Sequence, residues 1–201
     1  MYSDIVIKAK KYIEKLLANM EKEGYLFHNL EHSLDVFKRA SYLAKKEWLD
    51  DELREIVELS ALFHDSGFLK QYDKNEPIWA QIAEEWLKNN NYPEDKIDIV
   101  KSTILATDPM FENPENILQK IIKDSDLDNL WRDDFWDLYH KLHKEITTKS
   151  GKQFSYEDFL LRSWKFIGSY NFLTKTQQQE RGKKWEQNKK ELLEKIKQLS
   201  S

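Results

Sequence analysis

Three of the five histidines in this 201-residue chain fall in two short segments that also carry acidic residues. His28 and His32 are four residues apart, a spacing that puts both side chains on one face of a helix, one turn apart. His64 and Asp65 follow an apolar run and come just before Gly67, where a side chain can leave the core and point into a cleft. These residue types at these places suggest a site for acid–base or metal chemistry.

A third segment places Asp124, Asp126 and Asp128 directly after an apolar helical run. Buried carboxylates need compensating positive charge, and a metal ion is a common way to provide it. Neutral imidazoles with carboxylates form a borderline-hard ligand set that suits Mn, Fe, Co, Ni or Zn and, less specifically, Mg. Taken singly, each segment is also explained by a helix cap, a chance His-Asp pair or a solvated acidic turn. Their combination predicts a bound divalent metal ion.

The order of these residues resembles the H…HD…D signature of the HD superfamily of metal-dependent phosphohydrolases. Residues 27–32, FHNLEH, resemble the YHNxxH opening of that superfamily, which cyclic-nucleotide phosphodiesterases share. Residues 124–130, DSDLDNL, resemble its DADLDxL closing motif, and residues 132–135 resemble a branch of small predicted HD hydrolases. The resemblance is firm over residues 25–145, is loose over the C-terminal helices, and indicates little about the substrate.

Carried over by position, the resemblance implies that the metal ligands are His32, His64, Asp65 and Asp126. Asp126 is preferred to its acidic neighbours because it stands directly before Leu in the closing motif. The resemblance also implies that His28 is a catalytic proton donor near the leaving-group oxygen. A supporting or helix-capping role for His28 is an equally weighted interpretation.

Three positions depart from the family pattern. Asn75 stands where related hydrolases often have His, and no other histidine lies between Asp65 and Asp126. This favours one metal ion over two and argues against a di-iron oxygenase of the same fold. Phe27 replaces the usual Tyr, and Trp131 stands where relatives often have Gly.

The chemistry expected of such a site is phosphoester hydrolysis. A bound divalent ion lowers the pKa of a water and polarises a phosphoryl oxygen. Asp65 or a second carboxylate would orient the attacking water, and His28, if protonated, would protonate the leaving group. Arg132 is the first candidate for stabilising the phosphoryl charge because its planar fork suits phosphate. Further candidate cations are the lysines at three other positions, Lys70, Lys101 and Lys123.

The expected partner is a small phosphorylated substrate, such as a nucleotide. Tyr72, Trp79 or Phe111, which lie in or near breaks, are candidates to stack on a nucleobase. Two alternatives stay open: a metal-holding module that senses a nucleotide without turning it over, and a scaffold whose acidic cluster is simply surface. His140 and His143 are interpreted as surface residues, since no carboxylate has a persuasive spacing to them.

Helical periodicity dominates the chain that must position these groups. Only 5 Gly and 4 Pro are present, and no stretch alternates with period two. Asn29 is placed to cap a helix that carries His32, and Gly24 is placed to end the first helix. We expect an all-α, HD-domain-like bundle forming one domain over residues 1–201. Its metal-binding core spans about 25–145, and additional C-terminal helices, 150–201, pack on that core.

Charge and composition limit the partners. The formal net charge is −4 and the sequence pI is about 5.8, so no bulk attraction to a nucleic acid polymer or to a membrane surface is expected. The absence of cysteine excludes disulfides, thiolate metal sites and a cysteine nucleophile. No continuous apolar stretch suggests a signal peptide or a membrane span. We expect a cytoplasmic protein, with a homodimer through the helix at 175–199 left open.

Overall fold

Local sequence signals begin several of the helices. In the computed structural model, which describes residues 2–68, 70–73, 75–151 and 154–199, Asn29 caps α2 (Leu30–Lys46) by accepting hydrogen bonds from the backbone N–H groups of Glu31 and His32. Asp50 caps α3 (Asp51–Phe63) in the same way. A proline in the first turn begins α4 (Glu76–Asn89), and Pro93 directly precedes α5 (Glu94–Leu105).

The remaining elements are also helical. They are α1 (Asp4–Leu16), α6 (Ile117–Asp126), the short 3₁₀ helix η1 (Leu127–Trp131), α7 (Phe135–Lys149), α8 (Tyr156–Ser169) and α9 (Lys175–Leu199). No strand occurs among the described residues. The prediction of an all-α fold is therefore confirmed.

The first helix is shorter than its apolar pattern predicts. It ends at Leu16, and residues 17–24 form a series of turns that ends at Gly24, whose φ is +90°. The side chains of Leu17 and Met20 stay buried in these turns. The chain therefore turns between α1 and α2 while these apolar side chains stay buried.

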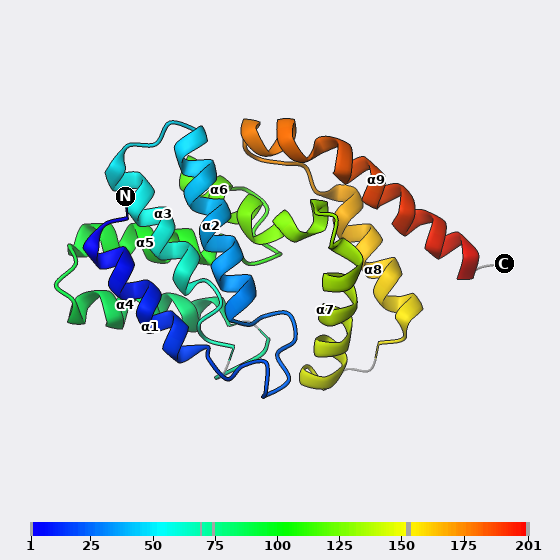
Figure 1. Ribbon diagram of the computed structural model, residues 1–201, viewed down its shortest axis with the longest axis horizontal. Coiled ribbons are helices and arrows are strands. Elements are labelled where there is room, and N and C mark those ends of the chain that lie inside the picture. Colours follow the sequence, from blue (N-terminus) through cyan, green and yellow to red (C-terminus); the bar gives the residue numbers. More distant parts are fainter. Residues whose placement is uncertain (1, 69, 74, 152–153, 200–201) are drawn as a thin grey trace.

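Two hydrophobic clusters hold the helices together. The larger joins residues of α1 to α6, and the smaller joins η1 with α7, α8 and α9 (Figure 1). Eight consecutive residues of α3, Ile56–Phe63, are buried, so this helix runs through the middle of the larger cluster. Its carboxyl end, which carries His64, is therefore held on several sides.

Buried carboxylates link the two clusters. Asp124 at the end of α6 accepts hydrogen bonds from Tyr170, Leu173 and Thr174, which lead into α9. Asp128 of η1 pairs with Arg39 of α2 at 3.3 Å and with Arg181 of α9 at 2.9 Å, and so connects elements of both clusters. The prediction that the whole chain is one domain stays a prediction. Among the described residues, no helix combines the length and the apolar character needed to cross a membrane.

Candidate metal centre

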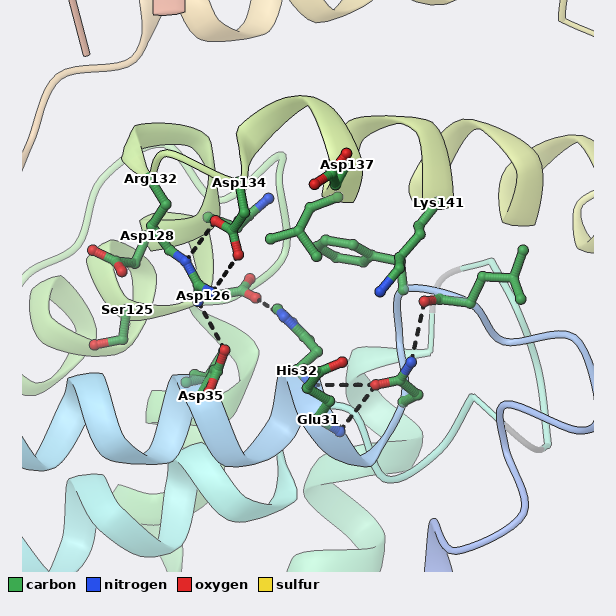
Figure 2. Close-up of a pocket in the computed structure, with 16 residues that line it drawn as sticks. Glu31, His32, Asp35, Ser125, Asp126, Asp128, Arg132, Asp134, Asp137 and Lys141 are labelled. Carbon is green, nitrogen blue, oxygen red and sulfur yellow. Dashed lines mark hydrogen bonds and ion pairs between the residues drawn. The ribbon is translucent and has the colours of Figure 1, made fainter. Parts of the chain in front are cut away.

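The ends of three helices bring the predicted ligands together. His32 lies in the first turn of α2, His64 follows the last residue of α3, and Asp126 ends α6. His32 Nε2 lies 3.2 Å from Asp126 Oδ1 and 3.4 Å from His64 Nε2, and the third distance, His64 Nε2 to Asp126 Oδ1, is 3.4 Å. Figure 2 shows His32 and Asp126 pointing toward one another across the cleft that they line. The three residues form one possible metal-binding group.

Asp65 lies beside this group of three. Its Oδ2 atom is 3.2 Å from His32 Nε2 and 3.3 Å from His64 Nε2. That oxygen is buried and has no hydrogen-bond partner among the described residues. A buried carboxylate oxygen without a hydrogen bond costs free energy, and coordination of a cation removes that cost.

The donor set fits a divalent metal ion. Metal-bound nitrogen and oxygen atoms lie about 2.0–2.2 Å from the ion, so neighbouring ligand atoms are about 2.8–3.6 Å apart, depending on the coordination geometry. The separations among His32 Nε2, His64 Nε2 and Asp126 Oδ1, 3.2–3.4 Å, match this spacing. The Nδ1 atom of His64 lies 2.8 Å from the Ala61 carbonyl, an arrangement that places the proton on Nδ1 and leaves Nε2 free to bind a metal.

Two imidazoles and two carboxylates lie close together here, and each group shifts the pKa values of the others. Burial lowers the pKa of His32, but the adjacent carboxylates of Asp126 and Asp65 outweigh this effect and raise the pKa to about 9. The pKa of His64 is likewise well above its ordinary value despite burial, because Asp65 and Asp126 adjoin it. Burial raises the pKa of Asp126, but His32 and His64 bring it down to about 2, and that of Asp65 also falls well below its usual range. Without a metal ion, protons on the histidines supply the compensating charge.

The other two aspartates of the closing motif serve the structure elsewhere. Asp124 is fully buried and is occupied by the donors that lead into α9. Asp128 accepts from Gln177 and Arg181. Of the three acidic residues at this helix end, only Asp126 faces the histidines, as the family motif implies.

His28 lies next to the metal centre and is held by a residue far along the chain. Its ring centroid is 5.9 Å from that of His32, and its ring stacks on Phe68 at 4.1 Å. Its Nδ1 atom is 2.5 Å from Glu145 Oε1, and Glu145 is fully buried in α7. Burial raises the pKa of Glu145, but hydrogen bonds from His28 and the backbone amides outweigh it and hold the pKa below its usual value.

A cleft of about 160 Å³ opens beside His32 and Asp126. Arg132, the predicted phosphate-binding residue, lines it but is already engaged: two guanidinium nitrogens donate to Asp134 and a third donates to Asp35 at 2.8 Å (Figure 2). The cleft's other cation is Lys141 of α7, which has no ion-pair partner among the described residues. Its carboxylates come from six residues, Glu31, Asp35, Asp126, Asp128, Asp134 and Asp137.

The lysines considered from the sequence lie outside this cleft. Lys101 pairs with Glu84 at 2.6 Å, and Lys70 lines a separate pocket with Ser66 and Trp86. Lys123 is buried and donates to the Ala106 and Asp108 carbonyls.

The aromatic and remaining histidine candidates have mostly structural surroundings. Trp79 is buried against Phe68, and the Tyr72 hydroxyl donates to Glu145, 3.1 Å away. Phe111 packs at the edge of the larger cluster. His140 and His143 pack against Tyr156, away from the metal centre.

Sequence reasoning did not find Glu145 or Lys141, and it considered Tyr72 only for stacking on a nucleobase. A signal did exist for Glu145 and Lys141, since Asp137, Lys141 and Glu145 are four residues apart and share one face of α7. Nothing local shows that this face turns toward His28, because the two segments are 117 residues apart in sequence.

Comparison with known proteins agrees with this geometry. The family model described as "HD domain" matches residues 29–158, which include His32, His64 and Asp126. The chain belongs to the HD domain family. It is also 33% identical over 108 residues to an uncharacterized protein of Clostridium beijerinckii (strain ATCC 51743 / NCIMB 8052), a match that spans 50% of this chain and 68% of the relative. No solved structure matches the chain.

Family membership supports the general predictions of metal binding and of relation to the phosphohydrolase superfamily. HD domains bind divalent metal ions, and this chain carries a possible His-His-Asp site for one. The family points to the metal-dependent phosphohydrolase superfamily, in which most but not all members are enzymes. The roles assigned to His28, Asp65 and Arg132 stay predictions.

Proposed function

We propose that this protein is a metal-dependent phosphohydrolase that cleaves a small phosphomonoester or phosphodiester, such as a nucleotide. The observation that carries the proposal is the grouping of His32, His64 and Asp126 beside an open cleft, with the unbonded Asp65 oxygen next to them. One divalent ion from Mn, Fe, Co, Ni, Zn or Mg would be the cofactor.

The four ligand residues would hold the ion. When bound, it supplies Lewis-acid chemistry, lowering the pKa of a water and polarising a phosphoryl oxygen. The Asp65 carboxylate orients the attacking water toward phosphorus. His28, whose Nδ1 is occupied by Glu145, has Nε2 left to pass a proton to the leaving oxygen.

Lys141 complements this arrangement at the cleft wall. An ammonium group without an ion-pair partner can bind a phosphoryl oxygen at no cost to another interaction. Arg132 would have to exchange Asp134 or Asp35 for the substrate before doing the same. We therefore infer that Lys141 makes the first contact with the phosphoryl group and that Arg132 shapes the cleft.

The test starts with metal content. Wild type, Asp126→Asn and the surface control Asp133→Asn would be loaded with Mn²⁺, dialysed and analysed by mass spectrometry. We expect about one ion per chain in wild type and in the control, and a loss of at least about tenfold in affinity for Asp126→Asn, because one of few ligands is removed. No bound metal in any of the three proteins would contradict the proposal.

The second step is a phosphoester screen with the loaded protein. The panel contains aryl phosphomonoesters, aryl phosphodiesters and nucleotides, each with wild type and Asp126→Asn. Turnover that disappears in the variant supports hydrolysis at this centre. Tight binding of one nucleotide without turnover of any ester would instead favour a sensor module.

A further inference from the structure

Glu145 collects hydrogen bonds from two separate parts of the chain, residues 27–28 and Tyr72. Its Oε2 accepts from the backbone N–H groups of Phe27, at 2.7 Å, and His28, at 3.0 Å. Its Oε1 lies 2.5 Å from His28 Nδ1 and 3.1 Å from the Tyr72 hydroxyl, which donates to it. All four contacts converge on a side chain with no solvent exposure.

A structural role alone does not account for a charged residue here. The two backbone N–H groups need only an acceptor oxygen, which a neutral glutamine would provide without the cost of burying a charge. The interaction that uses the charge is the short one with His28 Nδ1, since a carboxylate is the stronger partner for a histidine N–H. The burial of Glu145 is thus explained by what it does to His28.

Two neighbours complete the control of the imidazole. The Tyr72 hydroxyl fixes the rotation of the Glu145 carboxylate, and the Phe68 ring stacks on the His28 ring with centroids 4.1 Å apart. The His28 side chain is otherwise 20% exposed, so one edge of its ring stays accessible. With Nδ1 occupied, the atom left for chemistry is Nε2.

We propose that Glu145 is the positioning residue for His28, holding Nδ1–H so that Nε2 presents a proton to the leaving-group oxygen. This inference rests on the proposed function. In the step concerned, the water oxygen forms its bond to phosphorus while the bond from phosphorus to the leaving oxygen breaks. The leaving oxygen takes the proton from His28 Nε2, the attacking water releases one proton to solvent, and His28 regains a proton from solvent.

The decisive variant is Glu145→Gln, which keeps shape and an acceptor for the two backbone amides. Its NH₂ group would face Nδ1, which must then act as an acceptor. We expect turnover of phenyl esters, which need a proton on the leaving oxygen, to fall at least about 100-fold. Turnover of 2,4-dinitrophenyl esters, whose leaving group needs no proton, should fall much less, with KM and metal content unchanged.

A matched control is available in Glu58→Gln. Glu58 is also a buried glutamate, 2% exposed, but lies in α3 away from the cleft and accepts from Ser41. This variant should treat both esters as wild type does. Tyr72→Phe, a milder change, should lower turnover of the two esters in the same pattern as Glu145→Gln but by a smaller factor. The double variant His28→Asn with Glu145→Gln should turn over substrate no more slowly than His28→Asn alone.

The protonation state of the His28 imidazole provides an independent test. Long-range ¹H–¹⁵N NMR of the Zn²⁺-loaded protein should show His28 Nδ1 protonated in wild type and in Glu58→Gln, and unprotonated in Glu145→Gln. Equal losses on both esters, or an unchanged Nδ1 signal in Glu145→Gln, would overturn the inference. If wild type hydrolyses neither ester with any metal, the proposed function fails and the proton-donor role fails with it, while the NMR result still decides whether Glu145 sets the protonation of Nδ1.

Discussion

At the scale of single residues, several of the functional side chains are held by a second interaction on their far side. His64 Nδ1 is bonded to the Ala61 carbonyl, and His28 Nδ1 to Glu145. In both histidines Nε2 is thereby the nitrogen left free, because Nδ1 is occupied. Arg132 is held even more fully, and this is the reason Lys141 becomes the better candidate for phosphate contact.

Lys141→Ala should lower the catalytic efficiency on the substrate without changing metal binding. Loss of one charge-assisted hydrogen bond to a phosphoryl oxygen is expected to lower kcat/KM about 10- to 100-fold. Lys144→Ala is the matched control, since Lys144 is an exposed lysine of the same helix that does not line the cleft. Steady-state kinetics on the best ester of the screen measures both, and equal values for the two variants would contradict the role of Lys141.

The metal-free protein should lose stability as the pH rises. The pKa of His32 is raised from 6.5 to about 9, so the protonated histidine stabilises the fold fully below pH 6.5 and this contribution disappears as the pH passes about 9. Between pH 6.5 and 8.5 the loss should be roughly 2 kcal/mol of unfolding free energy.

Denaturant titrations with a chelator at the two pH values measure this loss. The same titrations with saturating metal provide the control, because metal and proton compete for His32 and metal binding strengthens as the pH rises. A pH-independent stability of the metal-free protein would show that Asp126 and Asp65 do not hold a proton on His32.

At the scale of elements, the site is built from helix ends. The candidate ligands lie in the first turn of α2, directly after α3 and at the end of α6, and side chains at helix ends can reach beyond the packed faces. The chain must then turn away from α3 directly after His64 and Asp65. Gly67 allows this, because a Cβ atom there would overlap Trp79 Cδ1, which packs near the His64 ring.

Gly67→Ala should therefore be destabilising even though the backbone at this position is not in the left-handed region. Displacing a buried Trp79 is expected to cost about 1–3 kcal/mol and to change the tryptophan fluorescence. Gly182→Ala in α9, where an added methyl meets nothing within 4 Å, should instead stabilise the protein slightly. Thermal denaturation compares the two, and an unchanged Tm for Gly67→Ala would mean that the turn has room to adjust.

At the scale of the whole molecule, the three aspartates at the end of α6 and in η1 have different roles. Asp126 faces the metal centre, whereas Asp124 and Asp128 tie the C-terminal helices to the same element. Helix α7 adds a second connection, because Glu145 reaches the segment that leads into α2. The smaller hydrophobic cluster is thus connected to the metal centre at two places.

Asp124→Asn should loosen this connection. The new NH₂ group would face donors from Tyr170, Leu173 or Thr174, so at least one buried donor loses its acceptor, at an expected cost of about 2–4 kcal/mol. Hydrogen exchange in α9 should accelerate. Asp133→Asn is the control, since Asp133 contacts Lys184 of α9 at the exposed surface and should matter little. Uniform exchange changes over the chain would argue against a local connection.

Much of this organisation was accessible from the sequence by itself. Helical periodicity and scarce glycine and proline predicted the all-α fold, and Asn29 was correctly expected to cap α2. The motif order predicted which histidines and aspartates would meet, because residue types and spacing within each motif are local properties. The end of α1 was predicted eight residues too late, since burial of Leu17 and Met20 in turns depends on packing against other helices.

Only the tertiary structure decided which groups surround these residues. It brings Glu145 to His28 across 117 positions and places Arg132 between Asp35 and Asp134, and neither result follows from local spacing. Sequence periodicity states which face of a helix is polar, but packing determines what that face meets. The grouping of His32, His64 and Asp126 could therefore be predicted from their motifs, whereas the residues that support them became visible only in the folded chain.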